Sequence, residues 1–250
     1  EQIHKVRPHL GQLFVASRME MILSDSTILM DHEDCNRVQD PYSFRCIPQV
    51  HGPVQETLLK LMDTVAIELN SSTDNPLIFP DAENPGPHEV VSQGNFHAEV
   101  LAIVSDTMSL ALFELSSISE RRIDQMLDPS RLAIRPFLAE NPGLESGLMI
   151  VQYAAAAALG ELRGHASPRT AFSTTTSAGQ EDHVSMGATA SWNLLEAVQR
   201  CSEVIACEAF VAHRALKIID KKSSTCIESF IRLYLINISE PTRHHQITYD

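Results

Sequence analysis

Apolar residues recur at helical spacing along four long stretches of the chain. In the stretch from Val54 to Asn70 they form one stripe, while Glu56, Lys60 and Asp63 lie off it. The stripe consists of Val54, Leu58, Leu61, Met62, Val65 and Leu69. A repeat every three to four residues predicts an amphipathic helix.

The other three stretches predict longer or more buried helices. Residues 97–127 contain neither Gly nor Pro and have a broad apolar surface, which predicts a long helix packed on several sides. Ser146 to Arg163 carries the run Ala154 to Ala158, whose small side chains let a neighbouring helix approach closely. The fourth helix is expected from about Gln180 to Asp220, with Glu181 and Asp182 in its first turn.

Polar, turn-rich segments connect these blocks. Residues 34–52, 129–143 and 168–179 are expected to be loops, and residues 71–95 irregular chain with a short hairpin. The fold class that follows is mainly α, a long-helix bundle with irregular loops that present functional groups. We expect one helical region over residues 1–220, followed by a divergent tail over residues 221–250.

Composition narrows the range of functions. The 250 residues are 44% hydrophobic, enough for a substantial core, and carry a net charge of −13. Such a surface repels phosphate backbones and anionic lipids, so neither nucleic acid nor a membrane is an expected partner. We expect no stretch to be long enough to span a bilayer, since the longest candidate, Leu148 to Gly160, is interrupted by Gln152 and falls short of the roughly 20 apolar residues required. A small-molecule substrate or a protein partner fits better.

Five cysteines without CxxC spacing argue against a disulfide framework and a zinc cage, and favour a cytoplasmic location. The chain opens with Glu1 rather than Met and has no signal peptide, so we expect Glu1 to mark a cut or a boundary.

The first candidate site lies in residues 39–49. There, a loop stiffened by two prolines displays Gln39, Tyr42 and Arg45. A guanidinium grips a carboxylate in two places, a phenol can donate or accept a proton, and an amide can orient a polar group. This set suits an amino-acid substrate. The alternative is that Arg45 simply pairs with a local acidic residue.

Three further segments carry weaker signals. Phe96, just before the second helix, is placed to wall a pocket, and Asn75 begins an Asn-Pro turn. Glu181, Asp182 and His183 could be metal ligands, but the H-E-x-x-H spacing is missing, so no metal is predicted. A carboxylate aimed at a substrate ring, or simple helix capping, remains open there.

Taken in order, these segments resemble the histidine and aromatic amino-acid ammonia-lyase family. The matching stretches are residues 37–45 (RVQDPYSFR), 72–77 (STDNPL), 94–97 (GNFH), 119–123 (SERRI) and 180–187 (QEDHVSMG). The similarity runs from about Arg7 to Arg214, and Glu181 is similar to the histidine branch of the family.

The resemblance implies a lyase that converts L-histidine to urocanate and ammonia, using a methylidene-imidazolone electrophile (MIO) built from an internal Ala-Ser-Gly. It implies Tyr42 and Glu181 as catalytic residues, with Tyr42 and Gln39 flanking the reacting centre and Glu181 facing the imidazole. It also implies that Arg45 binds the substrate carboxylate, that Asn75 positions the amino-acid end and that Phe96 lies near the electrophile. Family members resemble tetramers with active sites at subunit junctions.

The chain departs from the family in several places. It contains no Ala-Ser-Gly, and the nearest sequence is Glu145-Ser146-Gly147. The family pattern also differs at Gln93, Glu145 and Leu162. We therefore expect the chain to be inactive alone and to need a complementing N-terminal chain or a homo-oligomer. The alternatives are a non-catalytic helical assembly protein, or a phenylalanine or tyrosine lyase or aminomutase.

Overall fold

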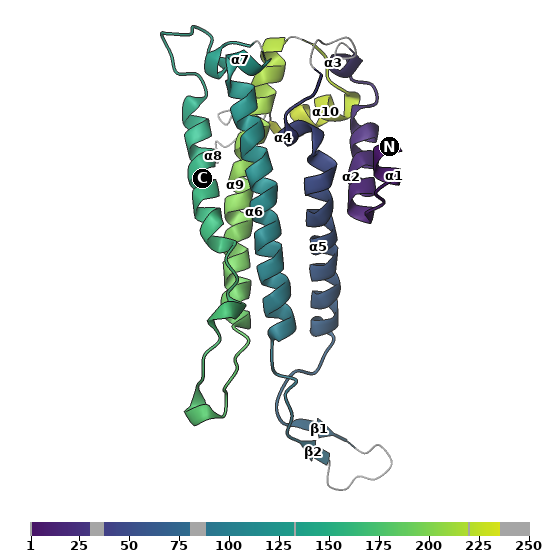
Figure 1. The fold of residues 1–250 in the computed structure, drawn as a ribbon, viewed down its shortest axis with the longest axis vertical. Helices are drawn as coiled ribbons and strands as arrows, with labels where there is room; N and C mark the ends of the chain where they lie inside the picture. The colour runs from purple at the N-terminus through teal and green to yellow at the C-terminus, as the bar shows by residue number, and fades with distance from the viewer. Residues whose placement is uncertain (1, 31–37, 81–88, 133, 220, 236–250) are drawn as a thin grey trace, which may run out of the picture.

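The computed structural model describes residues 2–30, 38–80, 89–132, 134–219 and 221–235. Within them, four long helices run side by side and form an elongated bundle (Figure 1). They are α5 (Ile47–Leu69), α6 (Glu99–Leu127), α8 (Met149–His165) and α9 (Gly187–Ile219). The predicted fold class, a mainly α long-helix bundle, is confirmed.

Shorter elements occupy the ends of the bundle. The short helices are α1 (Gln2–Lys5), α2 (Leu10–Leu23), α3 (Thr27–Met30), α4 (Tyr42–Arg45), α7 (Pro129–Leu132) and α10 (Thr225–Phe230). Single turns lie at Pro136–Leu138, Thr170–Phe172, Ser177–Gly179 and Ile231–Leu235. The predicted hairpin is formed by β1 (Leu77–Phe79) and β2 (Glu89–Val91), paired antiparallel with Ile78 opposite Val90.

Helix α6 lies at the centre of the bundle and packs against α5, α8 and α9. One core cluster contains Ile123 and Val211, and another contains Leu162 and Ala197, all completely buried. Ala155 of the predicted alanine run is also completely buried, which is how α8 comes close to its neighbours. The core is therefore built between α6, α8 and α9.

The expectation that no stretch is long enough to cross a membrane was wrong for α6. Its 29 residues have the length and apolar composition of a membrane span, and half of the most apolar window is buried inside the bundle. A helix surrounded by other helices needs apolar residues on several sides, and its position among α5, α8 and α9 gives a physical reason for this composition.

Helix α5 begins seven residues before the predicted start, because Pro48 and Gly52 do not break it. Proline is tolerated in the first turn, where its missing N–H would have no helical acceptor. Gly52 meets Gly11 of α2 backbone to backbone: a Cβ on Gly11 would lie 2.2 Å from the Gly52 carbonyl oxygen. The residue that we interpreted as a loop former is thus a close-packing position.

Helix α9 begins at Gly187, so Glu181 and Asp182 are not in its first turn, as predicted, but in the loop that precedes it. The loop is held by a backbone bridge between Thr176 and Glu181, and Met186 adopts a positive φ of 55° directly before the helix. Helix capping by Asp182 is therefore excluded.

Helix α2 was not predicted, because the residues it buries are Gly11, Gln12 and Ala16 and give no apolar stripe. The segment after residue 220 contacts the turn that follows α2: the Thr225 amide donates to Asp25 Oδ1 at 3.1 Å, and the Thr27 hydroxyl donates to the Lys222 carbonyl at 2.6 Å. The domain boundary at residue 220 stays a prediction.

Candidate active site

Three of the predicted site residues, Gln39, Tyr42 and Arg45, lie together at one end of the bundle and are called here the Arg45 cluster. The Arg45 guanidinium carbon is 4.6 Å from the centroid of the Tyr42 ring, and Tyr42 is 70% exposed. Both side chains thus face solvent at the mouth of an open cleft of about 750 Å³.

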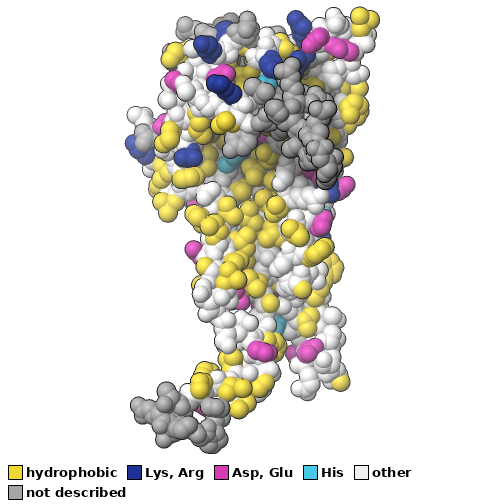
Figure 2. Space-filling model, turned by 180° about the vertical axis from the view of Figure 1, so that it is seen from behind, with side chains coloured by type: hydrophobic (Ala, Val, Ile, Leu, Met, Phe, Trp, Pro, Cys, Tyr) yellow, Lys and Arg dark blue, Asp and Glu magenta, His cyan; other side chains and the backbone are white. Residues whose placement is uncertain are grey.

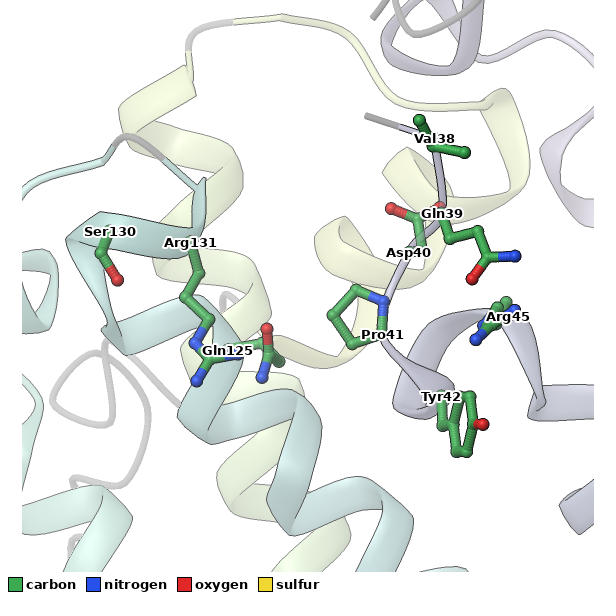
Figure 3. A pocket seen from close by; sticks show the side chains of 9 residues that line it. All are labelled: Val38, Gln39, Asp40, Pro41, Tyr42, Arg45, Gln125, Ser130 and Arg131. Carbon is green, nitrogen blue, oxygen red and sulfur yellow. The ribbon is translucent and has the colours of Figure 1, made fainter. Parts of the chain in front are cut away.

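The other side of this cleft is formed by residues that the sequence did not single out. Gln125, at the end of α6, and Ser130 and Arg131 of α7 lie across Pro41 from the Arg45 cluster (Figure 3). The family-like segment 119–123 lies just before Gln125 on α6, but only the fold shows that Gln125 lines the cleft. The cleft is lined by two guanidinium groups, Arg45 and Arg131, and by the Asp40 carboxylate. Because Arg131 is paired with Asp128, Arg45 is the group suited to bind an anion.

A buried ion pair fixes the helix that carries the Arg45 cluster. Arg122 of α6 binds Glu208 of α9 through two nitrogens, with Nη2 2.9 Å from Oε2, and its Nη1 donates to the Ser43 carbonyl of α4 at 3.3 Å. Arg122 is 7% exposed. Three segments distant in sequence are therefore joined by one guanidinium directly beneath the cluster.

His51 of α5 belongs to the same buried region. Burial, and to a lesser extent the nearby Arg122, lower the pKa of its imidazole to about 4 against an opposing effect of Glu208. Its Nε2 is shielded from solvent and has no hydrogen-bond partner. His51 is therefore neutral at neutral pH and adds no positive charge beneath the cleft.

The remaining predicted residues, Asn75, Phe96 and Glu181, lie on loops at the other end of the bundle and are called here the Glu181 cluster. The Asn75 side-chain oxygen accepts the Gln93 amide at 3.0 Å, and the Gln93 side chain donates to the Asp74 carbonyl at 2.7 Å. Phe96 is 54% exposed. These bonds join the segments on either side of the hairpin.

Glu181 is held within its own loop. The Thr176 hydroxyl donates to its carboxylate, and the Thr176 amide donates to its carbonyl at 2.9 Å. These hydroxyl contacts, from Thr176 first and Ser177 second, lower the pKa of Glu181 below its usual value. The group is an exposed, fixed carboxylate that suits a cationic or N–H-donating ligand.

Helix length keeps the two clusters apart. The 23 residues of α5 lie between Arg45 and Asn75, and at 1.5 Å per residue they span about 34 Å. Phe96 precedes α6 while Gln125 lies near its end, so α6 enforces the same separation. The resemblance implies that all six candidate residues serve one active site, but within a single chain they form two clusters at opposite ends of the long helices (Figure 1).

The three departures from the family pattern all have defined roles. Gln93 joins two loops, as described above. Glu145 accepts the Asn141 amide at 2.8 Å and so closes the turn before α8. Leu162 is completely buried in the core among α6, α8 and α9. These substitutions are compatible with the fold rather than disruptive to it.

A further group near the Glu181 cluster was missed. His97 and His183 stack with their ring centroids 5.8 Å apart, next to Glu99. The sequence suggested His183 as a ligand only together with Glu181 and Asp182. Nothing in residues 180–187 indicates that His97, 86 residues earlier, lies beside it.

Comparison with known proteins gives a consistent result. A sequence model described as "Aromatic amino acid lyase" matches residues 1–234. The "Probable histidine ammonia-lyase" of Halobacterium salinarum is 46% identical over 87% of this chain and 43% of its own length. The "Histidine ammonia-lyase" of Myxococcus xanthus is 44% identical over 86% of this chain and 41% of its own. The chain thus spans less than half the length of these relatives.

Solved structures agree. The crystal structure of histidine ammonia-lyase from Trypanosoma cruzi superimposes with a TM-score of 0.83 at 37% identity, covering 96% of this chain and 44% of that one. The phenylalanine aminomutase of Pantoea agglomerans gives a TM-score of 0.82 at 31% identity, covering all of this chain and 50% of its own.

Proposed function

Because the chain belongs to the aromatic amino acid lyase family, we propose that it forms the substrate-binding half of a histidine ammonia-lyase, which converts L-histidine to urocanate and ammonia. The observation that carries this proposal is the pair of exposed polar clusters, one cationic and one anionic, at the two ends of the bundle. Histidine suits both clusters, because its carboxylate can bind a cationic group and its imidazole N–H can bind an anionic one.

Each cluster has chemistry suited to one end of histidine. Arg45 would bind the carboxylate with its planar fork of donors, and Gln39 would orient it. Tyr42, adjacent to that anchor, would take part in removing the β-proton. Glu181, kept ionised by the hydroxyls of Thr176 and Ser177, would accept the imidazole N–H, and Asn75 would help to position the amino-acid end.

The MIO group expected in this family would supply the electrophile that activates the amino group as a leaving group. The residues present fit this group: the Phe96 ring is 54% exposed, so a planar heterocycle could contact it. Because residues 1–250 contain no Ala-Ser-Gly, the group would have to come from polypeptide outside them. We therefore propose that this chain alone does not turn over histidine.

A second copy of the chain would bring the two clusters together. Two copies packed antiparallel would place the Arg45 cluster of one beside the Glu181 cluster of the other, because each cluster lies at an opposite end of the same long helices. The bundle has an apolar side for such packing, with hydrophobic side chains gathered along its middle (Figure 2). Exposed residues of the long helices include Met62, Val65, Ile103, Trp192, Leu195 and Val198.

An exposed apolar surface of this kind marks a protein interface. The tetramer that the family resemblance implies would be built from such antiparallel pairs. Ile103→Asp should therefore weaken self-association, whereas Leu144→Asp, in a loop where Leu144 is 91% exposed, should not. Light scattering across a concentration series separates these outcomes, and equal effects of the two changes would count against the interface.

The activity is tested by supplying the missing half. The chain is co-expressed with the portion of the Myxococcus xanthus enzyme that it does not match, and urocanate formation from L-histidine is followed by its ultraviolet absorbance. We expect activity only when both parts are present. An assembled complex that contains the electrophile but does not form urocanate would overturn the proposed activity.

The shared site is tested with two variants in that complex. When Arg45→Ala and Glu181→Gln are placed on separate copies of the chain, random pairing leaves about a quarter of the sites with both native residues. Activity should therefore recover well above that of either variant alone. If each site were made within one chain, mixing would restore nothing.

The high structural similarity to an aminomutase favours a second candidate, a lyase or aminomutase that acts on phenylalanine or tyrosine. Glu181 distinguishes histidine from phenylalanine, since a phenyl ring offers no hydrogen-bond donor to a carboxylate. In the reconstituted complex, Glu181→Gln should reduce kcat/KM for histidine more than for phenylalanine. Equal losses on both substrates would favour the second candidate or a structural role.

A further inference from the structure

Three potential metal ligands from two distant segments meet at the end of the bundle that carries the Glu181 cluster. His97 lies two residues before Glu99, the first residue of α6, and His183 lies in the loop before α9. Glu99 Oε2 is 3.9 Å from His97 Nδ1 and 3.7 Å from His183 Nε2, and all three atoms lie within 4.8 Å of one another.

The other nitrogen of each imidazole already has a hydrogen-bond partner. His97 Nε2 is 3.1 Å from the His183 carbonyl oxygen, an acceptor, so it carries the proton and leaves a lone pair on Nδ1. His183 Nδ1 is 3.3 Å from the Ser173 hydroxyl, which itself accepts the Val184 amide. Outer partners of this kind orient the histidine ligands of protein metal sites.

The Glu99 carboxylate gives an independent indication of a missing ligand. Although the Glu99 side chain is 36% exposed, its Oε2 is shielded from solvent and has no hydrogen-bond partner. A shielded carboxylate oxygen without a partner is unfavourable by roughly 1–3 kcal/mol or more. This oxygen is the atom that faces both free imidazole nitrogens, at distances too long for hydrogen bonds.

We propose that His97, Glu99 and His183 bind a divalent transition-metal ion, of which Zn²⁺ is the natural probe. Two imidazole nitrogens and one carboxylate oxygen, with a further position open to water, form a recognised donor set for such ions. Metal–ligand distances near 2.1 Å in a tetrahedral arrangement place ligand atoms about 3.4 Å apart. The two spacings that include Glu99 need to close by only a few tenths of an ångström, whereas the two imidazole nitrogens, which lie within 4.8 Å, need to approach by up to about 1.4 Å, a movement that rotation of the exposed His183 ring can supply.

The bound ion would fasten the Glu181 loop to α6. His183 lies two residues after Glu181, and His97 directly follows Phe96, so a metal bridge would fix the relative positions of two members of the Glu181 cluster. The ion would be held partly in solvent, because the His183 side chain is 67% exposed. Binding would therefore be reversible and removable by a chelator.

Metal binding is measured by titrating Zn²⁺ into the metal-free full chain by calorimetry at neutral pH. We expect one equivalent to be lost, or its affinity to fall at least tenfold, in Glu99→Gln and in His183→Gln. His9→Gln is the matched control, since His9 is an exposed histidine outside this group and should leave the titration unchanged. Circular dichroism confirms that each variant has the helix content of the native chain.

Ser173→Ala tests the outer partner without touching a ligand. It should weaken Zn²⁺ binding by roughly tenfold, because His183 loses the hydroxyl that orients it. A second readout is limited proteolysis of residues 173–186, which Zn²⁺ should slow in the native chain but not in His183→Gln.

If the native chain and the Glu99→Gln and His183→Gln variants bind Zn²⁺ indistinguishably, the proposed site is overturned and the three residues form only a His–Glu contact. Neither measurement needs turnover, so failure here is separate from failure of the proposed lyase activity.

Discussion

The two ends of the bundle hold their candidate functional groups in different ways. At the Arg45 end, Arg122 and Glu208 form a buried ion pair that joins α4, α6 and α9 beneath the cluster. At the Glu181 end, the groups lie on exposed loops joined by side-chain hydrogen bonds, such as those of Gln93 and Thr176.

This difference means that the Arg45 end depends strongly on its polar contacts for stability, whereas the Glu181 end does not. A buried ion pair loses a large amount of stability when one partner is removed, because the other charge remains unpaired in a low-dielectric environment. Exposed hydrogen bonds contribute little to global stability, because water can replace the lost partner. The end proposed to bind the carboxylate, common to all amino acids, is the rigid one, and the end proposed to select the side chain is built from replaceable loops.

The largest expected effect is on stability at the Arg45 end. Arg122→Ala should lower the free energy of unfolding by about 3–5 kcal/mol, because the Glu208 carboxylate, which is only 18% exposed, is left without an opposing charge. Arg131→Ala is the matched control: the side chains of its ion pair with Asp128 are 47% and 37% exposed, so removing this pair should change stability little. Urea unfolding measures both, and equal losses would contradict the distinction between the ends.

The next effect is on catalysis at the same end. In the reconstituted complex, Arg45→Ala should lower kcat/KM by about a hundredfold, equivalent to roughly 2–3 kcal/mol for a lost charge-assisted clamp. Arg45→Lys keeps the charge but not the planar fork, so its loss should be smaller. Steady-state kinetics unchanged in Arg45→Ala would refute the assigned role.

A smaller effect concerns the pH dependence of the Arg45 end. Folded His51 stays neutral down to about pH 4, whereas in the unfolded chain it takes up a proton near pH 6.5. The unfolded state binds more protons in this interval, so the free energy of unfolding should fall as the pH drops from 6.5 to 4. The contribution is about 2 kcal/mol after allowance for solvent screening.

His51→Gln removes this titration, and its stability should vary less with pH than that of the native chain. Urea unfolding at several pH values gives the comparison, with His9→Gln as an exposed-histidine control that keeps the native slope. Parallel curves for His51→Gln and the native chain would show that His51 is not the group responsible.

The smallest effect is expected at the Glu181 end. Gln93→Ala removes side-chain bonds to Asp74 and Asn95 and should change the free energy of unfolding by about 1 kcal/mol or less. Proteolysis within residues 71–95 should nevertheless accelerate, whereas Gln199→Ala, an exposed position on α9, should change neither quantity. A global loss as large as that of Arg122→Ala would show that the two ends are equally integral to the fold.

The sequence by itself determined the local structure. Periodic apolar positions gave α6 and α8 within a few residues, and the turn-rich segment gave the hairpin, because these patterns report which face of an element is buried. The local pattern was misleading at Gly52, which lies in a helix and packs against the distant Gly11. It also missed α2, because this helix buries too few apolar residues to show a stripe.

The family-like motifs also identified the groups of both clusters, but only the tertiary structure decided where they lie. A straight helix of 23 residues separates Arg45 from Asn75, so motifs close in sequence end far apart in space. Packing also brings together residues that no local pattern connects: Arg122 with Glu208, and His97 with His183. Sequence spacing measures distance along an element, whereas a site depends on which ends of different elements meet.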